Sequence, residues 1–252
     1  MNDVDIILPV HNEKDILLTV LREWASVLNK MNISYSFVIC EDGSTDGTKK
    51  LLLKLQKAYP IHLNQASLRR GYGRAVLDGI ASSNGTYVLC IDSDGQCDPR
   101  DFHTFWKLRH KNKVIIGWRL TRMDTWIRIL YSRLFHVLFS LLFFNRLHDP
   151  STPFVLFQKK SILPYVHYLT YLHEGFWWGF IGTCLKFSIS VMELPIHHRA
   201  RLKGKTQIYS LKRMPSLAMR NIVGLFALRF AKKYAFNKNN IFRIAAQGNT
   251  RS

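Results

Sequence analysis

Acidic residues are scarce in this chain and are concentrated in its first half. The 252 residues include 36 Lys and Arg against 17 Asp and Glu, a formal charge of +19. Residues 1–100 carry 12 acidic and 11 basic side chains, residues 101–252 carry 5 and 25, and no acidic residue follows Glu193. We therefore expect the second half to face a polyanion, such as nucleic acid, a phospholipid surface or a phosphorylated substrate.

Cysteine is also rare, and its spacing matches no metal motif. The chain has Cys40, Cys90, Cys97 and Cys184, with no Cys-x-x-Cys among them. This excludes a disulfide scaffold and predicts reduced thiols. Because apolar residues make up 47% of the chain and charged residues 21%, a disordered protein is excluded as well. The opening MNDVDIILPVHNE has acidic residues where a signal peptide needs basic ones, so we expect no secretion signal.

Short apolar runs alternate with segments of helical periodicity through the first half. This pattern is typical of an α/β fold with a mostly parallel, Rossmann-like sheet flanked by helices. We expect strands at Asp5–Val10, Tyr35–Cys40, Ile61–Leu63, Tyr87–Ile91 and Val114–Gly117. Helices are expected over residues 14–29, 46–59, 73–82 and 99–110. Because crossovers in such a sheet are right-handed, the strand ends should gather at one edge, where ligands bind.

Two later segments are apolar but too charged to cross a membrane. A spanning helix needs about 20 apolar residues, whereas the longest uncharged run within residues 126–146 is Leu134–Asn145. Four polar side chains there fall on one line of an amphipathic helix: Arg128, Ser132, His136 and Ser140. The opposite, apolar side should pack on the sheet or lie at a membrane interface, and both options stay open. We expect residues 217–234 to form another surface helix.

The strongest local signal is Cys-Ile-Asp-Ser-Asp-Gly-Gln at residues 90–96. It places Asp92, Asp94 and Gln96 just beyond a buried strand, where alternation points all three the same way. Two carboxylates and an amide oxygen are hard ligands suited to Mg²⁺ or Mn²⁺. An isolated Asp-x-Asp could equally serve a turn or a helix cap. The residues at the neighbouring strand ends therefore decide between these roles and a metal site.

Other strand ends supply that context. Residues 41–47 read Glu-Asp-Gly-Ser-Thr-Asp-Gly, and residues 9–13 read Pro-Val-His-Asn-Glu. Carboxylates at such ends can hold ribose hydroxyls, but no Gly-x-Gly-x-x-Gly follows the first strand, which disfavours a dinucleotide-dependent dehydrogenase. Residues 69–74, Arg-Arg-Gly-Tyr-Gly-Arg, join cations to a glycine turn before a helix and could cradle a phosphate.

Four motifs occur in one order: Pro9-x-x-Asn12-Glu13, Asp42-Gly43-Ser44-x-Asp46-Gly47, Arg69-x-Gly71-x-Gly73 and Asp92-x-Asp94-x-Gln96. Together they resemble the family 2 glycosyltransferases of the GT-A fold. Later landmarks are similar to the polyprenyl-phosphate branch, the dolichol-phosphate mannose or glucose synthase-like enzymes. These landmarks are Gly117-x-Arg119, Arg128-x-x-x-Ser132, Asp149-Pro150-Ser151, Glu193-x-Pro195-Ile196 and Arg201-x-x-Gly204-x-Thr206. The resemblance covers roughly residues 3–210.

The resemblance implies roles for the matched residues. The nucleotide sugar would be bound by Pro9, Asn12, Glu13, Asp42, Arg69, Gly71 and Asp92. The catalytic residues and metal ligands would be Asp92, Asp94 and Gln96, with Mg²⁺ or Mn²⁺. The acceptor phosphate would be held by Arg119, Arg128, Ser132 and Arg201. Residues 1–210 would form the GT-A domain, with an amphipathic interface helix at 124–146, and residues 211–252 a basic, apolar helical tail.

Two departures from the branch pattern leave local details open. The branch usually has a Lys near the end of the Arg201 motif, whereas Gln207 follows Thr206 here, and Lys205 could supply the cation instead. The segment after Asp149 usually continues as Ser-Gly-Phe, whereas this chain has Thr152-Pro153, which removes a turn glycine.

A phosphate acceptor agrees with the basic second half. A phosphate monoester already carries about 1.5 to 2 negative charges at neutral pH, so it needs cations and no general base. We therefore expect an inverting transfer of a hexosyl group from a GDP- or UDP-sugar to dolichyl or undecaprenyl phosphate. The enzyme would act peripherally at the cytoplasmic face of a membrane, with a membrane-protein subunit or a second copy as a possible further partner.

The sequence is compatible with three other functions. A family 2 transferase acting on a glycan or protein hydroxyl would need a base, for which Asp149 or Glu174 is available. A nucleic-acid-binding protein would bind the phosphate backbone with its basic second half. This function does not explain the acidic residues at 92–96, so we expect no nucleic-acid partner. A silent relative that only binds nucleotide sugar is disfavoured because the metal ligands are present.

Overall fold

A seven-stranded sheet organises the chain. The computed structural model describes residues 2–120, 126–172, 174–200 and 214–233, without the side chains of 126–131 and 214. The strands are β1 (Val4–Val10), β2 (Tyr35–Asp42), β3 (Ile61–Ala66), β4 (Tyr87–Cys90), β5 (Val114–Arg119), β6 (Val155–Gln158) and β7 (Val191–Ile196). Their order in the sheet is β3-β2-β1-β4-β6-β5-β7. β6 is antiparallel to both of its neighbours, and every other pair is parallel.

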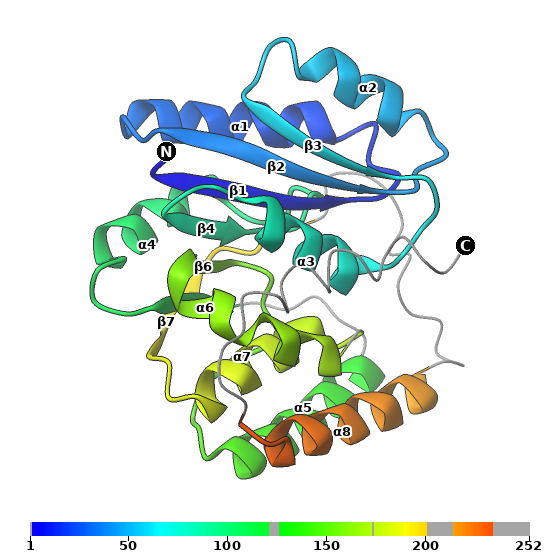
Figure 1. Ribbon diagram of the computed structural model, residues 1–252, viewed down its shortest axis with the longest axis vertical. Coiled ribbons are helices and arrows are strands. Elements are labelled where there is room, and N and C mark those ends of the chain that lie inside the picture. The colour runs from blue at the N-terminus through cyan, green and yellow to red at the C-terminus, as the bar shows by residue number, and fades with distance from the viewer. Residues whose placement is uncertain (1, 121–125, 173, 201–213, 234–252) are drawn as a thin grey trace.

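Helices cover both faces of this sheet (Figure 1). They are α1 (Leu17–Lys30), α2 (Thr48–Leu55), α3 (Tyr72–Ser82), α4 (Phe102–Leu108), α5 (Trp126–Phe143), α6 (Lys159–Ile162), α7 (Phe176–Lys186) and α8 (Met214–Phe230), with 3-10 turns η1 (Pro99–Asp101) and η2 (Leu163–Tyr171). Strand alternation sorts the core into two layers: Ile6 and Leu8 pack with α1 and α4, whereas Ile7 packs with α3. The predicted α/β class and mostly parallel sheet are confirmed.

The five strands expected in the first half are present, with ends shifted by a few residues. β6 and β7 were not predicted from the sequence. β6 has only four residues and follows directly on a polar turn, so it offers too short an alternation to detect. β7 is an edge strand of the sheet, and Glu193 and Pro195 interrupt its short apolar run.

The helix expected over residues 124–146 is α5, and it packs on α7 rather than on the sheet. Phe135 and Phe139 lie against Trp178, with ring centroids 4.9 and 5.0 Å away. Gly182 of α7 allows the close approach, because a Cβ there would lie 3.0 Å from the Phe143 ring. α8 lies beside α5 in this outer layer, on the side of the molecule away from β3 (Figure 1). No helix in the described part of the chain has the length and apolarity of a membrane span.

Candidate active site

The carboxyl ends of β1, β2 and β4 form one edge of the sheet, and the predicted nucleotide-binding residues gather there. The register pairs Val10 with Glu41, at the ends of β1 and β2. The Ser93 hydroxyl, just after β4, donates to the backbone oxygen of Pro9 at 2.8 Å. The three strand ends are therefore joined by direct contacts, as the sequence predicted.

Asp42 fixes the glycine loop that follows β3. Its buried carboxylate accepts hydrogen bonds from the backbone N–H of Arg70 at 2.6 Å and of Gly71 at 2.8 Å. Gly43 has a φ of +70°, and a Cβ there would lie 2.5 Å from the backbone nitrogen of Arg69. Only glycine fits so close a backbone contact. Asp42, Arg69 and Gly71 are thus brought together, with the Arg69 side chain exposed at the rim.

Asn12 and Glu13 brace the acidic turn from the β1 side. The side-chain oxygen of Asn12 accepts from the backbone N–H of Thr45 at 2.8 Å, while the Asn12 N–H donates to Ser44 Oγ at 3.0 Å. The backbone N–H of Glu13 donates to Thr48 Oγ1 at 3.1 Å. These bonds join the two loops directly, and a nucleotide-binding role for their side chains stays a prediction.

A hydrogen-bond chain reaches Asp92 from two distant elements. Trp177 Nε1 of α7 donates to the Tyr72 hydroxyl at 2.9 Å, and that hydroxyl donates to Asp92 Oδ1 at 2.8 Å. Burial, and after it the Asp92 charge, raise the pKa of Tyr72 well above its ordinary value, so the hydroxyl stays protonated. The sequence did not predict this chain of hydrogen bonds. Tyr72 belongs to a motif that was noted, but no sequence signal pairs it with Trp177.

Asp94 and Gln96 complete the loop after β4. The Gln96 N–H donates to Asp94 Oδ1 at 3.1 Å, and Gln96 Nε2 donates to the Arg199 oxygen at 3.2 Å. Within the described residues, no three His, Cys, Asp or Glu side chains gather as a metal cluster. A cation would therefore depend on the Asp92 and Asp94 carboxylates and the Gln96 amide oxygen. These hard oxygen donors fit Mg²⁺ or Mn²⁺, which commonly take their remaining ligands from water and substrate phosphate.

The segment that leads to Arg201 starts at this same loop. The Arg199 N–H donates to the Gln96 oxygen at 2.8 Å, and the Arg199 guanidinium pairs with Glu23 at 2.8 Å and Asp98 at 2.9 Å. Arg201 itself lies outside the described residues. Its predicted role at the acceptor phosphate stays a prediction.

Arg119, at the end of β5, is held by a network of acidic groups. Its Nε and Nη2 donate to the Asp149 carboxylate at 2.6 and 2.9 Å, and Nη2 also donates to Ser151 Oγ at 2.8 Å. The Glu193 carboxylate of β7 accepts from the backbone N–H groups of His148 and Asp149. Burial alone would lower the pKa of Arg119, but Asp149, with a smaller contribution from Asp92, raises it. The guanidinium is therefore a fixed cation beside the acidic loop.

A pocket of about 220 Å³ opens next to this network, at the inner side of α5. Its lining consists of Ser132, Arg133, His136, His148, Asp149 and Trp178. Ser132 thus lines this pocket, and its predicted role at the acceptor phosphate stays a prediction. Arg128 lies one helical turn earlier in α5, with its side chain outside the described part. The sequence had indicated His136 through the polar line of this helix, but it gave no signal for Arg133, His148 or Trp178.

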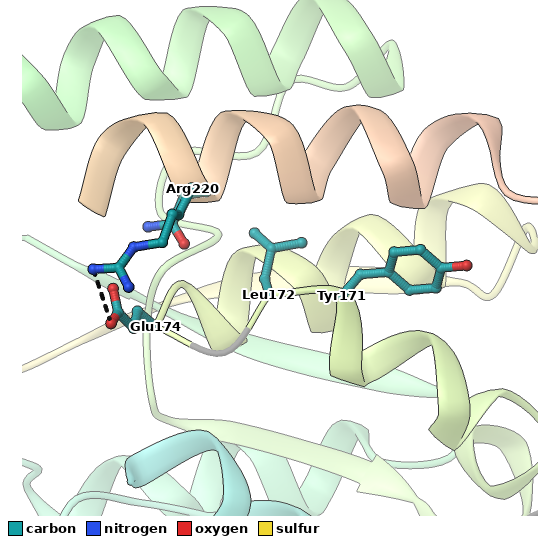
Figure 2. Close-up of a pocket in the computed structure, with 5 residues that line it drawn as sticks. Tyr171, Leu172, Glu174 and Arg220 are labelled. Carbon is teal, nitrogen blue, oxygen red and sulfur yellow. Dashed lines mark ion pairs between the residues drawn. The ribbon is translucent and has the colours of Figure 1, made fainter. Parts of the chain in front are cut away.

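Glu174, the other candidate base, lies in a separate pocket of about 120 Å³ between the start of α7 and α8. Figure 2 shows Arg220 reaching from α8 to Glu174, with an N–O distance of 3.6 Å. The linings of the two pockets share no residue. The two carboxylates proposed as alternatives therefore do not act on one substrate position.

The fold and the acidic loop after β4 together define a glycosyltransferase of the GT-A type. Residues 5–164 match the family model described as Glycosyl transferase family 2, and the chain belongs to that family. It is 24% identical over 221 residues to the undecaprenyl-phosphate 4-deoxy-4-formamido-L-arabinose transferase of Sodalis glossinidius (strain morsitans). That match covers 86% of this chain and 66% of the relative.

Solved structures support the same fold. Glucosyl-3-phosphoglycerate synthase from Mycobacterium tuberculosis, in complex with Mn²⁺, UDP and phosphoglyceric acid, superposes with a TM-score of 0.69 at 14% identity, covering 92% of this chain and 80% of that one. Mannosyl-3-phosphoglycerate synthase from Rubrobacter xylanophilus gives a TM-score of 0.61 at 12% identity, covering 100% and 76%. The predicted GT-A fold and glycosyltransferase class are confirmed.

Proposed function

We propose that this enzyme transfers a hexosyl group from a nucleotide sugar to a polyprenyl phosphate, with inversion at the anomeric carbon. The observation that carries the proposal is the pocket beside Arg119, where the Ser132 hydroxyl and the Arg133 guanidinium can donate hydrogen bonds to an anion. The neighbouring acidic loop suits the metal-bound diphosphate of the donor. A relative whose name specifies undecaprenyl phosphate supports the same acceptor class.

A phosphate acceptor also agrees with the state of Asp149. Both oxygens of its carboxylate accept hydrogen bonds, from Arg119 and from Ser151 at 2.7 Å. Taking a proton from a hydroxyl acceptor would disrupt these bonds. A lipid phosphate is already ionised, so the reaction needs no base at this position. The geometry thus favours phosphate over a glycan or protein hydroxyl.

The chain's own residues bind and orient the reactants. An oxygen of the lipid phosphate attacks the anomeric carbon as the bond from that carbon to the donor diphosphate breaks, and a single displacement inverts the configuration. A divalent cation held by Asp92, Asp94 and Gln96 would supply the Lewis acid that neutralises the leaving diphosphate. Tyr72 orients Asp92 by its hydrogen bond, and Arg119 stabilises the charge between the two substrates.

The same proposal assigns the parts of the chain. Residues 1–210 are assigned to the catalytic domain and residues 211–252 to a basic tail; in the described part of that tail, α8 packs on α7. The enzyme works peripherally at the cytoplasmic face of a membrane, where its acceptor resides. A nucleic-acid partner does not account for the acidic loop, because carboxylates repel a phosphate backbone.

The test pairs donor binding with transfer. Purified enzyme is screened by thermal shift against GDP- and UDP-sugars with Mn²⁺, and radiolabel transfer into an organic-extractable polyprenyl product is then measured. We expect Asp94→Ala to abolish the Mn²⁺-dependent shift. We expect Arg128→Ala to keep the shift but lower transfer at least ten-fold, while Lys107→Ala, at an exposed position on α4, changes neither.

Two results would contradict the proposal. Label that reaches only water-soluble acceptors would remove the lipid assignment. Equal loss of donor binding in Asp94→Ala and Arg128→Ala would show that the metal and acceptor groups are not separate.

A further inference from the structure

The outer helices carry two exposed apolar stripes. On α5 and the residue after it, the stripe consists of Leu134, Val137, Leu141 and Phe144; on α8 it consists of Met219, Val223, Phe226 and Phe230. These positions recur at three- and four-residue steps, so each set lies along one side of its helix. Leu141 is 69% exposed and Phe144 is 85% exposed. Apolar side chains this exposed and this regularly placed indicate a binding surface.

The two stripes belong to one surface. α5 and α8 pack side by side, and both bury their other sides on α7, since Phe143 and Leu228 meet at Gly182. At the same end, the Arg229 guanidinium lies 5.8 Å from the centre of the Phe144 ring. Both stripes therefore face away from α7. We call these eight side chains the α5–α8 face.

The α8 part of this face is firmly anchored. A Cβ at Gly224 would lie 2.6 Å from the Tyr171 backbone oxygen, so the helix contacts the η2 segment directly. Lys186 Nζ donates to the Arg229 and Ala231 oxygens at 2.8 and 2.7 Å, which caps the helix end. The apolar stripe is thus presented by a fixed element.

Cations predominate around the face. Neither α5 nor α8 contains an acidic residue, and exposed cations border the stripes at Arg133, Arg146, Lys232 and Lys233. Arg220 of α8 is paired with Glu174. A second copy of the same face would bring cations against cations. An anionic bilayer offers both a complementary charge and an apolar layer for the stripes.

We propose that the α5–α8 face binds the surface of an anionic lipid bilayer, with its apolar side chains inserted below the headgroups. The inference rests on the proposed function in one respect, namely that the acceptor reaches the site from this bilayer. The placement supports that route. Ser132 and His136 of α5 line the acceptor pocket, and the exposed stripe runs along another side of the same helix, whose diameter is about 10 Å.

The experiment measures vesicle binding by the full chain. Extruded vesicles of phosphatidylcholine alone, or with 30% phosphatidylglycerol, are sedimented with wild type and variants, at low and high salt. We expect binding to the anionic vesicles and about a five-fold loss of partition per removed surface cation. Leu141→Glu and Val223→Glu should each lower partition at least ten-fold. Leu53→Glu, at an exposed leucine of α2, is the matched control and should keep it.

A second measurement separates this inference from the proposed function. Transfer to a short, water-soluble prenyl phosphate is followed without vesicles, and Leu141→Glu should retain it. Vesicle binding without such transfer in the wild type would refute the function and leave the lipid face standing. Transfer without vesicle binding would overturn the lipid face alone.

Three other outcomes would also overturn the inference. One is equal binding to neutral and anionic vesicles. Another is equal loss of binding in Leu53→Glu. The third is a concentration-dependent dimer that Leu141→Glu abolishes, with no binding to vesicles, because a second copy would then cover the face.

Discussion

The proposed donor side, at the ends of β1, β2 and β4, and the proposed acceptor side, around Arg119, handle charge in opposite ways. On the donor side, acidic groups are fixed by the chain's own donors before any ligand arrives, as Asp42 is by two loop amides and Asp92 by Tyr72. On the acceptor side, the cation Arg119 is the fixed group, and carboxylates hold it. Both sides are thus preorganised, the first with carboxylates that suit a cation and hydroxyl groups, the second with a cation that suits a phosphate.

The largest expected effect comes from breaking the acceptor-side ion pair. Asp149→Ala leaves Arg119, with 14% of its side chain exposed, without its main partner. Removing one member of a buried pair costs about 3 to 5 kcal/mol in the free energy of unfolding. Urea unfolding measures this loss. As a control, Glu174→Ala removes a pair whose side chains are 42% and 66% exposed, so it should cost at most about 1 kcal/mol. Equal losses would show that the Asp149 pair is not effectively buried.

A smaller effect is expected at Asp5, a buried carboxylate at the start of β1, on the sheet edge opposite the candidate active site. It accepts hydrogen bonds from Asn2, Ser36 and the backbone N–H groups of Asn84 and Gly85. Burial alone would raise the pKa of Asp5, and these bonds together lower it below its ordinary value of 3.8. Asp5→Asn should therefore cost about 2 kcal/mol at neutral pH, since two amides lose their anionic acceptor.

The lowered pKa of Asp5 determines how the difference in unfolding free energy between wild type and Asp5→Asn changes with pH. A carboxyl whose pKa is lowered on folding stabilises the native state above its unfolded pKa, and this contribution is lost as the pH falls through the folded pKa. The gap in unfolding free energy between wild type and Asp5→Asn should thus be constant near neutral pH and narrow below about pH 4. Chemical denaturation across this range measures it. A gap that widens in acid would contradict the assigned hydrogen bonds.

The smallest expected effect concerns the hydrogen bond from Tyr72 of α3 to Asp92, just after β4. Tyr72→Phe removes the hydrogen bond to Asp92 and should cost about 1 kcal/mol in stability. We expect the Mn²⁺-dependent affinity for the donor nucleotide to fall about five-fold, because Asp92 loses its orientation. Calorimetry measures this, with Tyr59→Phe, whose ring lies against Phe37, as the control. Unchanged affinity in Tyr72→Phe would mean that the hydrogen bond does not position Asp92.

Most of the donor side could be predicted because its signals are local. Strand alternation and turn residues lie within a few positions of each other, so β1 to β5 and the acidic loops were found at the right places. β6 was missed because four residues carry too little periodicity, and β7 because Glu193 and Pro195 interrupt its short apolar run.

The acceptor side was less predictable because its signals are not local. The helix at α5 was expected, but its side chains are apolar around most of the wheel, so the sequence did not show which side would be buried. The structure buries Phe139 and Phe143 against α7 and exposes Leu134 and Leu141. Shape complementarity with Trp178 and Gly182 decided this, and neither residue is near in sequence.

By itself, the sequence determined the fold class, the acidic strand ends and the concentration of cations in the second half, because periodicity and charge are properties of order along the chain. Tertiary structure alone decided the Trp177–Tyr72–Asp92 hydrogen bonds, the pairing of Arg119 with Asp149 and the exposure of the α5–α8 face. Trp177 lies 105 residues from Tyr72. Such contacts depend on how elements pack, and packing is settled by the fit of whole surfaces.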